Sequence, residues 1–306
     1  MATRLFDTFQ NLILKLILRL IWILPEDFMR GLACLIGWAL AGLLRSRRRI
    51  MEENLRIAFG TDLNHDRMIH ICQQAWMNLI LTAMEVLRFP RWGERYLAEI
   101  HAEGVEHAER SVSAGRGMVA VVPHLGNWEI GGAWFARRFP FAVIARPLNQ
   151  EGVAQVLDDI RAQMGVTVFP RKSALKNVLA FLRRGGTVAF MLDQHASKHN
   201  VVVPFFGRPV KTFSSAAALA LRTGAAVHLG YIWRRPDRNL GLRICPPISL
   251  PQSGNFERDV REATVQYTAA IEAVVREHPD CWLWMHRRWR PVNHKQDACA
   301  TLAHGK

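Results

Sequence analysis

The segment GMVAVVPHLGNWEIGG, residues 117–132, decides the fold that the sequence predicts. Residues 117–123 form an apolar run rich in β-forming side chains, and a run of this length is typical of a buried strand. Pro123 and Gly126 then predict a loop, and Asn127 is a favourable N-cap for a helix that begins there. The segment therefore predicts a strand, a loop and a helix in direct succession, which is the repeating unit of α/β proteins.

The chain after this segment repeats the same unit. We expect further strands at residues 141–147, 166–170, 187–193, 226–235 and 240–248. Helices are expected at residues 149–165, 173–185, 213–224 and 256–278, with a loop at 194–212. Because strands alternate with helices, the sequence predicts an α/β fold with a mostly parallel sheet flanked by helices. Before the sheet, a helical pattern covers residues 51–89, with apolar positions such as Ile71, Ala75, Leu79 and Thr82.

The N-terminus predicts a helical, membrane-associating segment. Residues 11–24 are apolar but interrupted by Lys15 and Arg19, and a second apolar stretch covers residues 31–44. Both are shorter than the roughly 20 residues of a spanning helix, so we expect an amphipathic anchor that lies in the interface. A basic cluster follows that suits anionic headgroups, Arg45, Arg47, Arg48 and Arg49. An ordinary buried helical hairpin is the alternative, and Pro25-Glu26-Asp27 predicts a turn that argues against one tilted span.

This pattern divides the chain into three parts. Residues 1–50 are expected to form the hydrophobic and basic membrane anchor. Residues 51–291 are expected to form the catalytic domain, with a helical part at 51–110 and an α/β part at 111–291. Residues 292–306 form a tail.

Charge and cysteine content narrow the classes of function. The chain has 40 Lys and Arg against 26 Asp and Glu, a net charge of +14, which favours an anionic partner such as anionic lipid, a phosphorylated substrate or nucleic acid. A merely solubilising basic surface is the alternative. The five cysteines form no C-x-x-C pair, which argues against a disulfide framework or a cysteine zinc site. His195 and His199 are four residues apart but have no evident third ligand, so no metal site is expected.

Aromatic residues near the C-terminus leave two interpretations open. Trp282, Trp284 and Trp289 lie among arginines, a mixture that suits a membrane interface or base stacking. The apolar N-terminus favours the membrane, and we expect no nucleic acid partner. The segment Phe205-Phe206-Gly207 either lines an acyl cavity or forms a buried turn.

The spacing His124-x4-Glu129 is the candidate catalytic constellation. His124 follows the end of a predicted strand, where α/β sheets bind ligands, and Glu129 lies in the first turn of the next helix. Five residues apart on a straight helix, the two side chains would point about 140° away from each other. They meet only if His124 lies in the loop and folds back. A capped helix with a structural histidine is the alternative.

Such a pair suits acyl transfer to a hydroxyl. A neutral imidazole accepts the hydroxyl proton as the oxygen attacks a carbonyl. A carboxylate behind the imidazole fixes its tautomer, and amides at a helix N-terminus stabilise the developing negative charge. The sequence has no G-x-S-x-G motif, so we expect the acceptor hydroxyl to attack directly.

Several segments, in the same order, resemble the bacterial lipid A biosynthesis acyltransferases, the late lauroyl- and myristoyltransferases with His-x4-Glu. The resemblance covers roughly residues 10–291. The segments that carry it, besides VVPHLGNWEIGG (121–132), are RRRIMEENLRIAFG (47–60), ARPLN (145–149), RRGGTVAFMLDQ (183–194), VPFFGRPV (203–210) and WLWMHRRWRP (282–291).

The resemblance implies roles for individual residues. His124 and Glu129 would be the catalytic pair, Arg161 an arginine used in catalysis or phosphosugar binding, and Asp193 an acid near the site. Arg146 ends a predicted strand, so we expect it at the same sheet edge as a further substrate-binding residue.

The resemblance also implies the reaction. An acyl chain would move from acyl carrier protein to a hydroxyl of a phosphorylated glucosamine-based lipid, a lipid A precursor, without metal or organic cofactor. The enzyme would bind anionic lipids on the cytoplasmic face of the inner membrane. A lysophospholipid or another glycolipid is the alternative acceptor. A basic membrane- or nucleic-acid-binding protein without catalysis is the alternative from another class.

Overall fold

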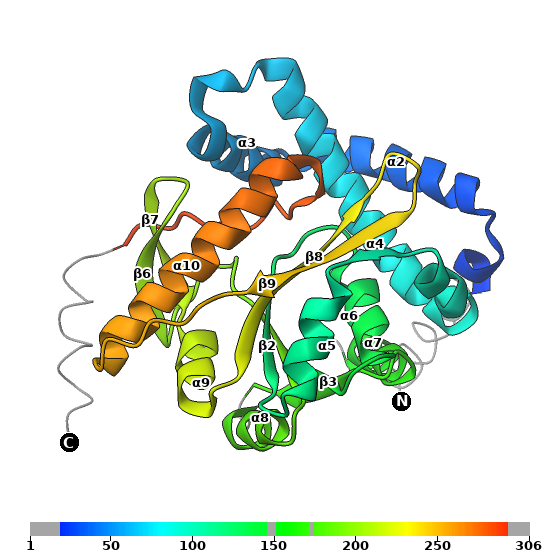
Figure 1. The fold of residues 1–306 in the computed structure, drawn as a ribbon. Helices are drawn as coiled ribbons and strands as arrows, with labels where there is room; N and C mark the ends of the chain where they lie inside the picture. The colour runs from blue at the N-terminus through cyan, green and yellow to red at the C-terminus, as the bar shows by residue number, and fades with distance from the viewer. Residues whose placement is uncertain (1–18, 146–150, 172–173, 293–306) are drawn as a thin grey trace, which may run out of the picture.

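A central seven-stranded sheet organises the computed structural model, which describes residues 19–145, 151–171 and 174–292 (Figure 1). Its strand order is β1-β9-β8-β2-β5-β3-β4. Strands β2, β3, β4, β5 and β8 are parallel, whereas β9 is antiparallel to β8 and β1 is parallel to β9. The bounds are β1 His101–Glu103, β2 Met118–Val122, β3 Phe141–Ala145, β4 Thr167–Pro170, β5 Thr187–Met191, β8 Ala226–Arg234 and β9 Leu240–Pro247. The predicted α/β fold with a mostly parallel sheet is confirmed.

Helices cover both faces of this sheet. Val119 and Val121 of β2 face one core, which also receives side chains of α8, α9 and α10. Met118 and Ala120 face the other core, which receives side chains of α5, α6 and α7. The helices are α5 Val105–Ser113, α6 Trp128–Ala136, α7 Glu151–Gln163, α8 Ala174–Arg183, α9 Ser215–Thr223 and α10 Phe256–Glu277. Burial on both faces explains why β2 is apolar throughout rather than alternating.

Two regions differ from the sequence prediction. The predicted loop 194–212 contains an antiparallel hairpin of β6 Asn200–Phe205 and β7 Arg208–Phe213. The prediction missed it because Pro204 and Pro209 pair within it, and proline argues against a central strand but is tolerated in an isolated two-stranded sheet. Strand β1 and helix α5 were not predicted either.

Helices α2 Glu26–Leu43, α3 Arg45–Phe59 and α4 His65–Ala98 precede the sheet in the chain and lie together at one end of it (Figure 1). The short 3₁₀ helix η1 Gly60–Asp62 separates α3 from α4. The chain bends at Leu24 and Pro25 before α2, next to the turn that was predicted at Pro25-Glu26-Asp27, whereas Glu26 and Asp27 already belong to the helix. Helix α2 packs closely on α4, since a Cβ at Gly37 would lie 2.9 Å from the backbone nitrogen of Met77.

The membrane anchor remains a prediction. Residues 1–18, with most of the first apolar stretch, lie outside the described residues, as does the tail from residue 293. Within the described ranges no single helix is long and apolar enough to cross a membrane. Helix α2 together with Arg45–Asp62 meets that requirement as a pair bent by 90°. The division into anchor, catalytic domain and tail likewise stays a prediction.

Candidate active site

His124 and Asp193 lie at the carboxyl ends of two adjacent strands. Val122, the last residue of β2, is in register with Met191, the last residue of β5. Each strand is followed two residues later by a polar side chain, and these two side chains meet. The Nδ1 of His124 lies 2.7 Å from Oδ1 of Asp193, and the backbone N–H of His124 donates to Oδ2 at 2.7 Å.

Asp193 is almost completely buried, with 2% of its surface exposed. The indole N–H of Trp282 donates to its Oδ2 at 2.8 Å. Burial alone would raise the pKa of this carboxyl. The nearby His124 ring and the hydrogen bonds from His124 and Trp282 outweigh burial and lower the pKa to about 2. Asp193 is therefore a carboxylate at neutral pH.

The ionised carboxylate determines the tautomer of His124. A carboxylate only accepts hydrogen bonds, so Nδ1 carries the proton and donates it to Asp193. In the neutral ring Nε2 then holds a lone pair, and the Gln194 side-chain amide lies 3.3 Å from it. The His124 side chain is 16% exposed, and its ring packs edge-on against Trp128 at 5.1 Å between centroids. This is the arrangement of a general base held by an acid.

The predicted contact between Glu129 and His124 is wrong, because Asp193 is the carboxylate on the imidazole. Glu129, in the first turn of α6, instead accepts two hydrogen bonds from Arg161 on α7, from Nε at 3.0 Å and from a terminal nitrogen at 2.5 Å. Both side chains are mostly buried, at 16% and 19% exposure. Burial opposes the charge of Arg161, but Glu129 outweighs it and raises the pKa of Arg161.

Four of the five residues that the sequence singled out therefore form two pairs, and neither is the predicted pair of His124 with Glu129. His124 pairs with Asp193, and Glu129 pairs with Arg161. Arg146, the remaining candidate, lies outside the described residues.

The loop that carries His124 is fixed by bonds that the sequence reading missed. Thr82 of α4, predicted as an apolar position, donates to the carbonyl of Gly126 at 3.0 Å. Gly126 has φ +58°, and a Cβ there would lie 2.2 Å from the carbonyl oxygen of Ile232, so glycine is required. Asn127 caps α6 through Ile130, as predicted, and also donates to buried Glu85 at 2.7 Å.

Glu85 belongs to a buried polar network beneath this loop. Arg234 of β8 donates to both carboxylate oxygens of Glu85, at 2.7 and 2.9 Å, and to Asn78 at 2.7 Å. Asn78, Thr82 and Glu85 are spaced four and three residues apart, so they share one face of α4. This polar stripe on an otherwise apolar helix face was the signal available in the sequence.

The C-terminal segment closes the other side of the loop. The backbone N–H of Gly126 donates to the carbonyl of Cys281 at 3.0 Å. The backbone N–H of Leu283 donates to the carbonyl of His124 at 3.1 Å. Trp282 and Trp284 are buried, so these two rings serve neither base stacking nor a membrane interface. Phe205 and Phe206 are also buried in this aromatic cluster, which favours the buried-turn alternative.

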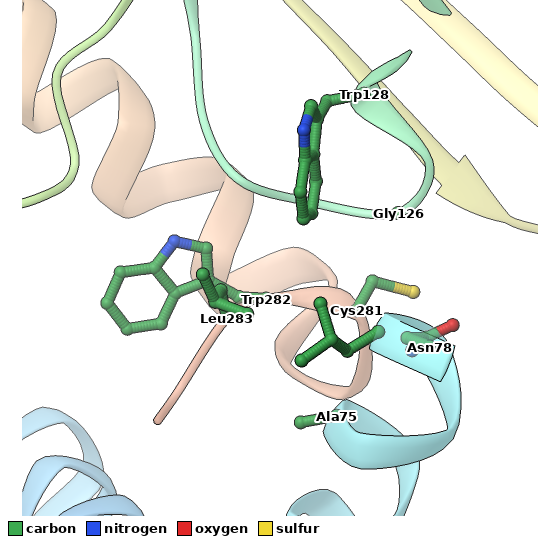
Figure 2. A pocket seen from close by; sticks show the side chains of 8 residues that line it. Ala75, Asn78, Gly126, Trp128, Cys281, Trp282 and Leu283 are labelled. Atoms are coloured by element: carbon green, nitrogen blue, oxygen red, sulfur yellow. The ribbon is translucent and has the colours of Figure 1, made fainter. Parts of the chain in front are cut away.

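A small, open hollow lies beside the loop that carries His124. Figure 2 shows helix α4 facing Gly126 and Trp128 across this space, with Trp282 and Leu283 alongside. It adjoins the candidate base, since Trp128 contacts the His124 ring and Trp282 binds Asp193. The lining residues are Ala75, Asn78, Leu79, Gly126, Trp128, Cys281, Trp282 and Leu283.

Metal-ligating side chains do not cluster in the part of the chain that the structure describes: no group of three or more His, Cys, Asp or Glu could hold a metal ion there. His195 uses its backbone N–H to donate to Nε2 of His286 at 2.9 Å.

Comparisons with known proteins give consistent matches. A family model described as bacterial lipid A biosynthesis acyltransferase matches residues 3–291. The phosphatidylinositol mannoside acyltransferase of Mycobacterium tuberculosis (strain CDC 1551 / Oshkosh) is 28% identical over 213 residues, which are 67% of this chain and 66% of that protein. The lipid A biosynthesis palmitoleoyltransferase of Escherichia coli (strain K12) is 25% identical over 278 residues, 89% of each chain.

One solved structure was also matched. The 1-acyl-sn-glycerophosphate (LPA) acyltransferase of Thermotoga maritima aligns with a TM-score of 0.37 and 15% identity, over 81% of this chain and 98% of that one. The chain spans just under two thirds of the length of the mycobacterial relative. The family match includes His124, Glu129, Arg161 and Asp193.

Proposed function

Since the chain belongs to the bacterial lipid A biosynthesis acyltransferase family, we propose that it transfers a fatty acyl group from an acyl carrier protein thioester to a hydroxyl of a phosphorylated glucosamine-based lipid. One observation carries this proposal: the Nδ1–H of His124 is held by ionised Asp193, which leaves the Nε2 lone pair to accept a proton. A basic membrane-binding protein without catalysis has no need of such a pair at the ends of two strands.

The reaction follows from this geometry. Nε2 of His124 takes the proton of the acceptor hydroxyl while its oxygen attacks the thioester carbonyl. Helix α6 begins four residues after His124, and the positive end of its dipole stabilises the oxyanion. The tetrahedral intermediate expels the thiolate, which recovers the proton from the imidazolium. The products are an ester and the free thiol of the carrier, so no further reactant is required.

Arg161 and Glu129 provide the proposed contact for the polar head of the acceptor. A guanidinium has five N–H donors, and Glu129 accepts two hydrogen bonds from it. The pair holds the guanidinium in a fixed orientation, and its other donors suit phosphate or sugar oxygens. Arg146 is proposed as a second such residue from its position after β3.

The N-terminal helices supply the proposed membrane surface. Seven of the ten large, exposed hydrophobic side chains in the described ranges lie between residues 20 and 44. They are Leu20, Ile23, Phe28, Leu35, Trp38, Leu43 and Leu44. The next helix, α3, begins with the sequence RSRRR, which suits anionic headgroups. We propose that this apolar and basic surface rests on the cytoplasmic face of the inner membrane and brings the site to its lipid acceptor.

A glycolipid of another kind is the second candidate acceptor. The mycobacterial relative, named for phosphatidylinositol mannoside, has a slightly higher identity, but over a shorter part of the chain than the lipid A relative.

Purified protein should therefore be incubated with acyl carrier protein or coenzyme A thioesters and one of three acceptors: a lipid A precursor, phosphatidylinositol mannoside or lysophosphatidic acid. We expect ester formation to be fastest with acyl carrier protein and the lipid A precursor. Faster transfer to either other acceptor would replace the proposed substrate, and no transfer to any acceptor would reject the proposed activity.

A further inference from the structure

Two consecutive residues contact the two nitrogens of the His124 ring. The carboxylate of Asp193 lies 2.7 Å from Nδ1, and the side-chain amide nitrogen of Gln194 lies 3.3 Å from Nε2. The backbone of this two-residue segment therefore determines where both side chains lie. A group that fixes the backbone at the end of this segment controls how the imidazole is held.

Arg288 is that group. Its terminal nitrogen NH1 donates to the carbonyl of Gln194 at 2.7 Å and to the carbonyl of Lys211 at 2.8 Å. The other terminal nitrogen donates to the hydroxyl of Thr212 at 2.6 Å. Arg288 thus joins the loop after β5 to strand β7 and to the C-terminal segment.

The setting of Arg288 is unusual for an arginine. The residue is completely buried, and its hydrogen bonds go to neutral oxygens rather than to a carboxylate. Its Nε is buried without a partner among the described residues, and its guanidinium lies 5.2 Å from the centre of the Phe205 ring. Burial lowers the pKa of Arg288 to about 10, with Asp193 opposing the decrease, so the side chain stays charged at neutral pH. Burying a cation costs free energy unless the charge is paired or hydrogen-bonded, so the three hydrogen bonds of Arg288 are needed to hold it there.

We propose that Arg288 is a positioning residue for acyl transfer: it fixes the backbone carbonyl of Gln194 and so the segment that carries Asp193 and Gln194, whose side chains then hold the His124 imidazole with Nδ1 protonated and Nε2 ready to accept a proton. This inference rests on the proposed function of His124 as the general base. The side-chain amide of Gln194 lies where the acceptor hydroxyl must bind. It therefore holds the His124 ring when no acceptor is bound, and the acceptor hydroxyl displaces it.

Other charged and titratable groups face this part of the site. His195 follows Gln194, Lys211 lies on β7, and His286 and Arg290 come from the C-terminal segment. Burial lowers the pKa of His286 to about 4 and also lowers the pKa of His195. Both rings are therefore neutral at pH 7.5. A change in the NMR signals of the His124 ring at this pH does not arise from protonation of His195 or His286.

The test compares wild type with Arg288→Lys and Arg288→Met. Arg88→Met is the matched control, because Arg88 is equally buried but contacts Met29 and Trp92 of the N-terminal helices. Two readouts are needed: kcat and KM for transfer, and the ¹⁵N signals of the His124 ring at pH 7.5 without substrate, assigned by their loss in His124→Gln.

For Arg288→Met we expect kcat to fall by about 10²-fold, the scale of a misplaced catalytic group, with little change in KM. The ring signals should shift from the Nδ1–H tautomer to a mixture, and Arg288→Lys should be intermediate. Arg88→Met should change neither readout even if its melting temperature falls as far. If Arg288→Met does not fold, the Lys variant decides, because it keeps the charge but not the forked donors.

Wild-type kcat and an unchanged His124 tautomer in the Arg288 variants would overturn the proposal. A loss of melting temperature alone, equal to that of Arg88→Met, would also overturn it, because Arg288 would then be structural only. The ring signals need no substrate, so a wild-type protein that transfers no acyl group would reject the proposed function while the positioning by Arg288 is still tested.

Discussion

Asp193 accepts a hydrogen bond from the imidazole of His124 and another from the backbone N–H of the same residue, each at 2.7 Å. One carboxylate thus fixes the ring and the loop that carries it. The partner of the base is Asp193 rather than Glu129. Replacing Asp193 and replacing Glu129 are therefore expected to change the enzyme's activity in different ways.

For Asp193→Asn we expect transfer to fall by about 10⁴-fold, the scale seen when the corresponding acid of a serine hydrolase triad is neutralised. An amide at this position no longer requires Nδ1 to carry the proton. The measurement is kcat in a variant shown to be folded by its near-ultraviolet circular dichroism. A folded Asp193→Asn protein with near-wild-type kcat would show that Asp193 does not orient the base.

The Glu129–Arg161 pair is expected to act on the acceptor. Arg161→Met and Glu129→Gln should each slow transfer to the phosphorylated lipid much more than any slow hydrolysis of the thioester by water, because water needs the base but no head-group contact. Both rates are measured on the same preparation, with Arg137→Ala as a control that breaks the exposed Arg137–Glu94 ion pair at the opposite end of α6 from Glu129. Equal loss of both rates would assign the pair to the chemistry or to the acyl donor.

Membrane binding is expected to depend on the exposed face of α2. Phe28, Leu35 and Trp38 are 60%, 62% and 64% exposed, so replacing them with serine removes little packing within the protein. Inserting one large apolar side chain contributes about 1.5–3 kcal/mol, so flotation with anionic vesicles should fall more than about tenfold for the triple variant. Leu175→Ser is the control, since Leu175 is 59% exposed on α8. Undiminished flotation of the triple variant would place the membrane contact elsewhere.

Stability is expected to fall as the pH drops from about 6.5 to 4. Burial lowers the folded-state pKa of His286 from 6.5 to about 4, so in this window the unfolded chain binds a proton that the folded protein does not. This difference lowers the free energy of unfolding progressively as the pH falls through this window. Urea denaturation at several pH values should show a smaller loss in His286→Gln, and the same pH dependence in both proteins would contradict the assignment.

Most strands and helices around the site were predictable because each is a short local pattern. The segment 117–132 contains its strand, loop, N-cap and helix within 16 residues. Hairpin β6–β7 was missed because its prolines argued against strands, while the register that accommodates them depends on the pairing of Pro204 with Pro209.

The pairing within the site was not predictable from spacing along the chain. His124 and Asp193 are 69 residues apart, and they meet only because β5 lies directly beside β2 in the sheet. The sequence placed His124 just after one predicted strand and Asp193 at the end of another, but it contains no local signal for which strands are neighbours. Glu129 seemed the partner because it is near in sequence, whereas its position in the first turn of α6 places it against Arg161 on α7.

The most direct test of the central claim is mass spectrometry of the lipid acceptor after incubation with acyl carrier protein thioester and either wild-type protein or His124→Gln. We predict that wild type increases the acceptor mass by one acyl group, and that a folded His124→Gln protein does so at least about 10²-fold more slowly, because it lacks the general base. Acylation by His124→Gln at the wild-type rate would contradict the account.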